Sequence, residues 1–294
     1  AGFEAQSFVT MFEKLQQAAR LNDSGAFPYL RSHPMTTERI ADAQARQELL
    51  PRRPALTLTP LHAMMAARAQ VLVNPGVEAL RTLSDQADSA QSKPLTLARQ
   101  AASFYVAVLS DLRLRDYAKA KRHLAQLQAL TGLDAPAQRV VRLLSAEVAL
   151  TTAEPNKAVA LLDVKPMPAA DRSMRLLLAQ ARVAMHQPAQ AHLAEQDLVG
   201  WLGLHGRDAL AWLTLSSAYQ AQGDSMRALR AQAEARLAEL DYSAAIDRFK
   251  AAQEVAIQLA RESKLDRAGH VEASIIDARL RESERLRREQ VLQR

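Results

Sequence analysis

The sequence predicts an all-α protein in which a small helical segment precedes a long series of paired helices. Of the 294 residues, 48% are hydrophobic but only 4% are aromatic, and the apolar residues are mostly Ala and Leu. Ala, Leu, Gln, Glu, Arg and Lys favour helices, and only nine Gly interrupt them. Apolar residues also recur at helical spacing. No apolar run approaches the ~20 residues that span a bilayer, so we expect no membrane-spanning segment.

The first elements follow from apolar spacing and from residues that end helices. Residues 5–21 are predicted to form an amphipathic helix, and residues 22–25 (Asn-Asp-Ser-Gly) break it. A loop at 32–34 (Ser-His-Pro) leads into a second helix over about 37–50, which Thr36 and Thr37 can cap. The apolar face of the first helix consists of Phe8, Met11, Phe12, Leu15 and Ala19.

A connector with two further helices comes next. Pro51, Pro54 and Pro60 bracket an extended stretch, and Pro60 suits the first position of a helix that runs to about residue 73. Asn-Pro-Gly at 74–76 is a turn, and another helix extends to about residue 89.

From about residue 93 a helix–turn–helix signature recurs. Its clearest copy has large, small, aromatic and turn residues at fixed positions: Trp212, Leu215, Ser216, Tyr219, Gly223, Asp224 and Ala228. We expect Trp212 to be the buried aromatic of the array. A weaker copy keeps Asp-Tyr-x-x-Ala, with Tyr117 and Ala120. This pattern resembles the tetratricopeptide repeat, a pair of helices of ~34 residues with small residues at the crossing. Two degenerate copies centre on Ala146 with Ala158 and on Ala179 with Ala191.

The small residues predicted at the crossings set the period of the array. Ala120, Ala158, Ala191 and Ala228 are separated by 38, 33 and 37 residues. A second Asp-Tyr-x-x-Ala, containing Tyr242 and Ala245, follows Ala228 after 17 residues. That half period suggests that one helix serves two successive pairs. The predicted fold is therefore a tetratricopeptide-like solenoid, and a generic Ala- and Leu-rich bundle is the alternative.

Three regions are expected along the chain. Residues 1–50 form the first helical segment, residues 51–92 the connector, and residues 93–294 the array with a terminal capping helix over about 271–293. That last helix alternates Arg and Glu, as the polar outer face of an array requires. Because the sequence opens with Ala1, we expect it to begin inside a longer protein whose targeting signal has been removed.

The residue types that catalysis needs do not occur in productive patterns. None of the seven histidines lies four residues from another, so the two-histidine helix of a zinc peptidase is missing. The sequence has no Cys and no Gly-x-Ser-x-Gly turn. It also has no Gly-rich phosphate loop, because Gly200, Gly203 and Gly206 are predicted to lie between helices, around Trp201. We therefore expect no catalytic residues, no bound metal and no cofactor in this chain.

The net charge is +6, with 38 Lys and Arg against 32 Asp and Glu. An excess of this sign is compatible with nucleic-acid binding. The basic residues are interleaved with acidic ones and do not form a stripe with aromatics. We interpret the charge as a solvated surface and expect no nucleic-acid partner.

One short motif connects the chain with a known class of enzyme. The segment Ser32-His33-Pro34-Met35-Thr36-Thr37-Glu38-Arg39-Ile40 resembles the His-Pro-x-Thr-x-x-Arg-Ile segment of zinc metallopeptidases of the HtpX/BepA type. The resemblance implies a parent peptidase that binds zinc in a catalytic domain missing here, of which residues 1–50 would be the C-terminal remnant. In it His33, held by Pro34, would lie against the zinc cleft as a regulatory ligand, and Arg39 would anchor the loop.

The same resemblance implies a periplasmic parent that acts in outer-membrane protein assembly or quality control. This chain would then be its non-catalytic interaction module, and its partners would be outer-membrane assembly components or unfolded substrates. One alternative is a stand-alone tetratricopeptide adaptor that binds an acidic peptide or nucleic acid. Another is an unrecognised enzyme, which would need a carboxylate beside His33.

Overall fold

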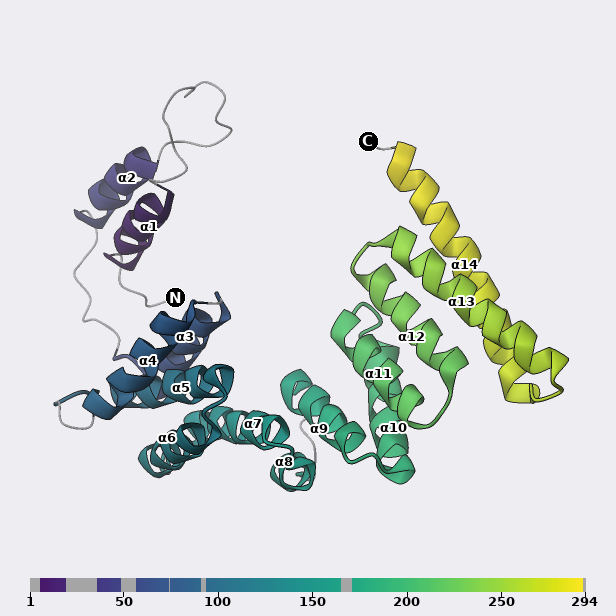
Figure 1. Ribbon diagram of the computed structural model, residues 1–294. Coiled ribbons are helices and arrows are strands. Elements are labelled where there is room, and N and C mark those ends of the chain that lie inside the picture. The colour runs from purple at the N-terminus through teal and green to yellow at the C-terminus, as the bar shows by residue number, and fades with distance from the viewer. Residues whose placement is uncertain are drawn as a thin grey trace. The chain divides into compact units, whose positions relative to one another are not determined.

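The computed structural model describes residues 6–19, 36–48, 57–73, 75–90, 94–164 and 171–292. Fourteen helices and no strand occur in these ranges, which confirms the all-α prediction (Figure 1). The helices are α1 Gln6–Ala19, α2 Thr36–Glu48, α3 Pro60–Leu72, α4 Val77–Ala90, α5 Leu97–Leu114, α6 Tyr117–Leu130, α7 Ala135–Thr151, α8 Pro155–Leu162, α9 Arg172–Ala184, α10 Pro188–Leu204, α11 Ala209–Ala221, α12 Ser225–Ala238, α13 Tyr242–Arg261 and α14 Arg267–Leu292.

The chain divides into two compact units, residues 1–59 and residues 60–294. In the first, α1 and α2 pack against each other, and Val9 is fully buried. On α2, Arg46 and Asp42 form an ion pair one turn apart, 3.0 Å between Nη2 and Oδ2. Helices were predicted over 5–21 and about 37–50, and the described residues of both regions are helical over 6–19 and 36–48.

In the second unit, helices pack mainly against those that are next to them in sequence. From α4 onward each helix contacts the following one, and α7 with α9 and α9 with α11 also pack across the intervening helix. Helix α3 packs on α5 and reaches α7. Helix α12, like every helix from α5 to α13, contacts both the preceding and the following helix.

One backbone turn recurs between paired helices and explains the spacing of the signature. Each copy ends a helix with a residue in the left-handed region, and the next residue opens the following helix. These residues are Arg115, Ala153, His186, Gly223 and Leu240, with φ between 53° and 78°. In four of the five turns, the residue after the left-handed one donates its backbone N–H to the carbonyl of the residue five positions before it. Asp224, for example, donates to Tyr219 at 3.0 Å. This is the hydrogen bond that closes a Schellman turn.

The signature alanines occupy one position in this turn. Ala120, Ala158, Ala191, Ala228 and Ala245 each lie five residues after the left-handed residue. Each donates its N–H to the carbonyl of the residue that opens its helix. All five are at most 1% exposed. A methyl group there lets the new helix approach its predecessor closely. Because each alanine lies five residues after its turn, the intervals 38, 33, 37 and 17 between the alanines are also the intervals between the turns.

Aspartates begin most of the helices of the second unit. The backbone N–H three residues later donates a hydrogen bond of 2.7–3.2 Å to each of Asp116, Asp134, Asp171, Asp208, Asp224, Asp241 and Asp266. The bond satisfies one of the four N–H groups that a helix start leaves without an intrahelical partner.

The buried side chains form a series of local clusters. One joins α3 to α7, another joins α7 to α9, a third joins α9 to α12, and a fourth joins α12 to α14. Each helix therefore depends mostly on its immediate neighbours for burial.

Two sequence interpretations need correction. The sequence placed Gly200 and Gly203 between helices, whereas both lie inside α10, which continues because Leu198, Trp201 and Leu202 are buried beside them. Trp212 was expected to be the buried aromatic of the array, but it is only partly buried, and Trp201 is 9% exposed. Trp212 lies at the edge of its cluster and donates its indole N–H to the Gly206 carbonyl at 2.9 Å.

Candidate functional site

The peptidase-like motif lies only partly within the described residues. His33 and Pro34 lie outside the described residues, and so does the side chain of Arg39, whose backbone belongs to α2. Their assigned role in a parent peptidase therefore stays a prediction.

The repeat signature residues lie on several helices with different surroundings. Tyr219 of α11 is 4% exposed, whereas Tyr117 opens α6 with 38% of its surface exposed. Tyr242 opens α13 and is packed against the cluster of the last three helices. Their positions are those of packing and turn residues.

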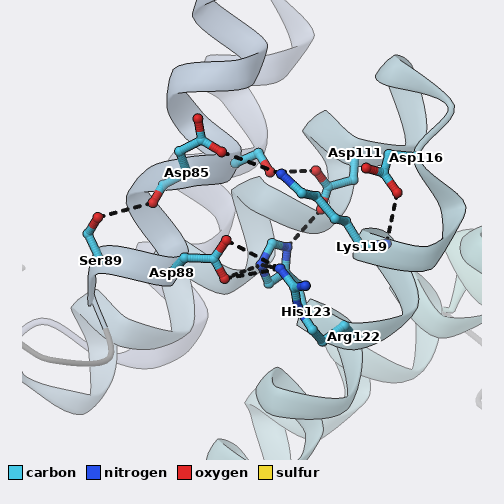
Figure 2. Close-up of polar contacts among 9 residues, drawn as sticks. Asp85, Asp88, Ser89, Asp111, Asp116, Lys119, Arg122 and His123 are labelled. Atoms are coloured by element: carbon cyan, nitrogen blue, oxygen red, sulfur yellow. Dashed lines mark hydrogen bonds and ion pairs between the residues drawn. The ribbon is translucent and has the colours of Figure 1, made fainter.

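A buried polar centre joins α4, α5 and α6, and sequence reasoning did not predict it. We call it the His123 centre; its members are Ser84 and Asp88 of α4, Asp111 of α5, and Arg122 and His123 of α6. Figure 2 shows the imidazole between the carboxylates of Asp88 and Asp111. The side chains of His123 and Asp111 have no exposed surface. One feature of the sequence could have indicated this centre: His123 lies on the same face of α6 as the apolar residues Ala120, Leu124 and Leu127.

Both ring nitrogens of His123 are engaged. Nδ1 lies 2.7 Å from Oδ2 of Asp111, and Nε2 lies 3.1 Å from Oδ1 of Asp88. Ser84 donates its hydroxyl to the other oxygen of Asp111 at 2.6 Å, and Arg122 donates to Asp88 at 3.1 Å. The hydroxyl thus faces the carboxylate and makes no bond to the imidazole, so this set lacks the serine–histidine pairing that activates a nucleophile.

The surroundings shift two pKa values in opposite directions. Burial alone lowers the pKa of His123, but hydrogen bonds to Asp111 and Asp88 and the charges of both carboxylates together outweigh it and raise that pKa above its usual 6.5. The hydrogen bond from His123 is the main cause that lowers the pKa of Asp88 below 3.8. The centre thus favours an imidazolium between carboxylates and ties three helices together.

A second polar link joins α3, α5 and α7. Arg68 donates two hydrogen bonds to the carboxylate of Glu147, at 2.9 and 3.1 Å, and a third to the Tyr105 hydroxyl at 3.2 Å. Burial raises the pKa of Tyr105, although Arg68 opposes the shift. This fork geometry fixes the three helices in register, because a guanidinium can match a carboxylate with two parallel bonds.

An open depression lies where α10 ends and α11 begins. It has a volume of about 780 Å³, and its lining includes Trp201, Leu204, Arg207, Asp208, Leu210 and Leu213. The His205 ring lies over Trp201, with 3.7 Å between ring centroids. A lining that mixes apolar and charged side chains suits a protein segment better than a small polar substrate.

Asp208 organises this turn. It caps α11, accepts the indole N–H of Trp201 at 2.9 Å, and accepts two bonds from Arg172 at 2.7 Å. Arg172 is the main cause that lowers the pKa of Asp208 to about 2. The carboxylate therefore stays ionised throughout the physiological range, and its hydrogen bond fixes the indole of Trp201, which lines the depression.

Within the part of the chain that the structure describes, no group of three or more His, Cys, Asp or Glu side chains could hold a metal ion. None of the described helices has both the length and the apolar character of a membrane-crossing segment. Comparison with protein-family models finds no match, and comparison with curated proteins finds none either.

Proposed function

We propose that this chain is a non-catalytic protein-binding module built from tetratricopeptide-like helix pairs. The observation that carries the proposal is the recurrence of one turn, with a left-handed residue followed five positions later by a buried alanine. Repeated units that pack on their sequence neighbours build extended surfaces, and such surfaces typically bind other protein chains.

The wider context of the module rests on the motif that contains His33, Pro34 and Arg39. Its resemblance to HtpX/BepA-type peptidases supports a parent that is a periplasmic zinc metalloendopeptidase. The module would then recruit outer-membrane assembly components or unfolded substrates to the zinc-bearing domain of that parent.

A binding experiment with the full 294-residue chain tests the proposal. The chain, immobilised through one terminus, is exposed to a purified outer-membrane β-barrel protein, either unfolded by dilution from urea or folded in detergent. Purified assembly components are tested in parallel. We expect saturable binding of an assembly component or of the unfolded barrel, with the folded barrel bound less.

Two results would contradict the proposal. The first is the absence of binding to every one of these proteins. The second is cleavage of casein by the purified chain with added zinc, which would show that the chain carries its own catalytic site. A binding signal that collapses as salt increases, and that nucleic acid reproduces, would instead favour the basic adaptor.

A further inference from the structure

The depression at the end of α10 exposes apolar side chains that nothing in the described structure covers. Leu204 is 84% exposed and Leu210 is 44% exposed, and both line the depression. They lie on either side of a short turn, so both can contact one ligand. Exposed leucines beside a buried tryptophan form the apolar part of a potential contact surface.

Four charged residues line the depression, and three of them already have an ion-pair partner. Asp208 is neutralised by Arg172 and by hydrogen bonds from Trp201 and the start of α11. Glu239 is paired with Arg236, 2.8 Å between Oε2 and Nη1. Arg207 is exposed and has no ion pair among the described side chains. One positive charge therefore remains for a ligand to neutralise.

We propose that the depression binds a protein segment in which an apolar side chain is flanked by carboxylates. The apolar side chain would contact Leu204 and Leu210, and one carboxylate would pair with Arg207. The inference rests on the proposed function, because it assumes that the module binds protein chains. It adds the class of segment recognised and the place where that segment binds.

A labelled peptide tests the proposal directly. A fluorescent peptide with a Glu-Leu-Glu core between Gly-Ser flanks is titrated with the full chain, and its anisotropy is measured. Peptides with Lys-Leu-Lys and Glu-Ser-Glu cores provide the comparison. We expect the Glu-Leu-Glu peptide to bind best, and added salt to weaken its binding because one ion pair is involved.

Two variants locate the site. Leu204→Ser should weaken binding by about tenfold, since it removes an apolar contact. Arg207→Glu should weaken it by about fivefold, because it replaces attraction with repulsion at an exposed pair. Leu133→Ser and Arg248→Glu are matched controls at exposed positions on other helices or turns, and they should bind like the original chain.

Several outcomes would overturn the proposal. These are no binding of the Glu-Leu-Glu peptide, equal binding of the Lys-Leu-Lys peptide, or equal losses in the control variants. A dimer that Leu204→Ser converts to a monomer in sedimentation would show that a second copy of the chain occupies the depression. If unfolded barrel binds while the peptide does not, this inference fails and the proposed function stands.

Discussion

At the scale of single residues, His123 shows how one buried imidazole can join three helices. Its two carboxylate partners come from two other helices, 12 and 35 residues away in sequence. No local pattern reveals such a set, because its members meet only after α4 and α6 have packed on α5. The same holds for Trp201, whose burial depends on α11 and on Asp208.

The His123 centre makes folding stability depend on pH. Because folding raises the pKa of His123, its contribution is complete below about 6.5 and is lost as pH rises through the raised value. Because folding lowers the pKa of Asp88, that contribution is present above about 3.8 and is lost as pH falls through the lowered value. The centre therefore stabilises the fold most between about pH 4 and 6.5.

Thermal unfolding of the chain and of His123→Gln at about pH 6 and about pH 9 measures this effect. We expect the original chain to have the higher Tm. The difference in Tm between the original chain and the variant should be larger at the lower pH and should shrink as pH rises. The other charged groups near the ring, Asp85, Lys119 and Arg122, remain in both proteins. His270→Gln, at an exposed position of α14, is the control. An equal difference at both pH values would refute the assignment.

At the scale of elements, the turns were the most predictable part of the chain because their chemistry is local. Capping aspartates and the small residue five positions after each turn can be recognised in sequence. The left-handed conformations of Arg115, Ala153 and His186 could not be recognised in sequence, because a non-glycine residue rarely adopts them. Turn closure and burial of the following helix stabilise these residues against about 1–2 kcal/mol of local strain.

Two glycines with opposite roles test this account of the turns. Gly223 has φ +78°, and a Cβ there would meet no atom within 4 Å, so Gly223→Ala adds backbone strain alone. We expect it to lower the free energy of unfolding by about 1 kcal/mol. Gly200 lies inside α10, where a Cβ also meets nothing within 4 Å. Gly200→Ala should raise that free energy by about 0.5–1 kcal/mol.

Urea unfolding followed by far-ultraviolet circular dichroism gives both values, and the two substitutions serve as controls for each other. The opposite signs are the informative result, since both changes add the same methyl group at open positions. If Gly223→Ala were as stable as the original chain, the left-handed turn would not be required between α11 and α12.

At the scale of the whole second unit, the order of packing follows from short turns between amphipathic helices, and it was predictable for that reason. The polar links between helices were not predictable from the sequence, because ion pairs such as that of Arg68 with Glu147 join positions 79 residues apart. Nor does sequence spacing say which apolar residues stay exposed. Leu204 follows buried Leu202 and Trp201 on the same helix.

Neighbour-to-neighbour packing predicts that damage stays local. Ala228 of α12 is 1% exposed within the cluster that joins α9 to α12, so Ala228→Leu forces about three methylene-sized groups into a filled space. Overpacking of this kind costs about 1–3 kcal/mol. We expect faster amide hydrogen exchange in α10, α11 and α12, and unchanged exchange in α3, α4 and α5, which share no buried cluster with α12.

Ala221→Leu is the matched control, because Ala221 is exposed at the end of α11 and has space for the larger side chain. Hydrogen exchange read by mass spectrometry resolves each helix separately, so the spread of the disturbance can be followed along the chain. If Ala228→Leu accelerated exchange in α3, α4 and α5 as much as in α11, residues 60–294 would unfold as one cooperative body. Local clusters would then not be its units of stability, and the neighbour-only account of its packing would have to be abandoned.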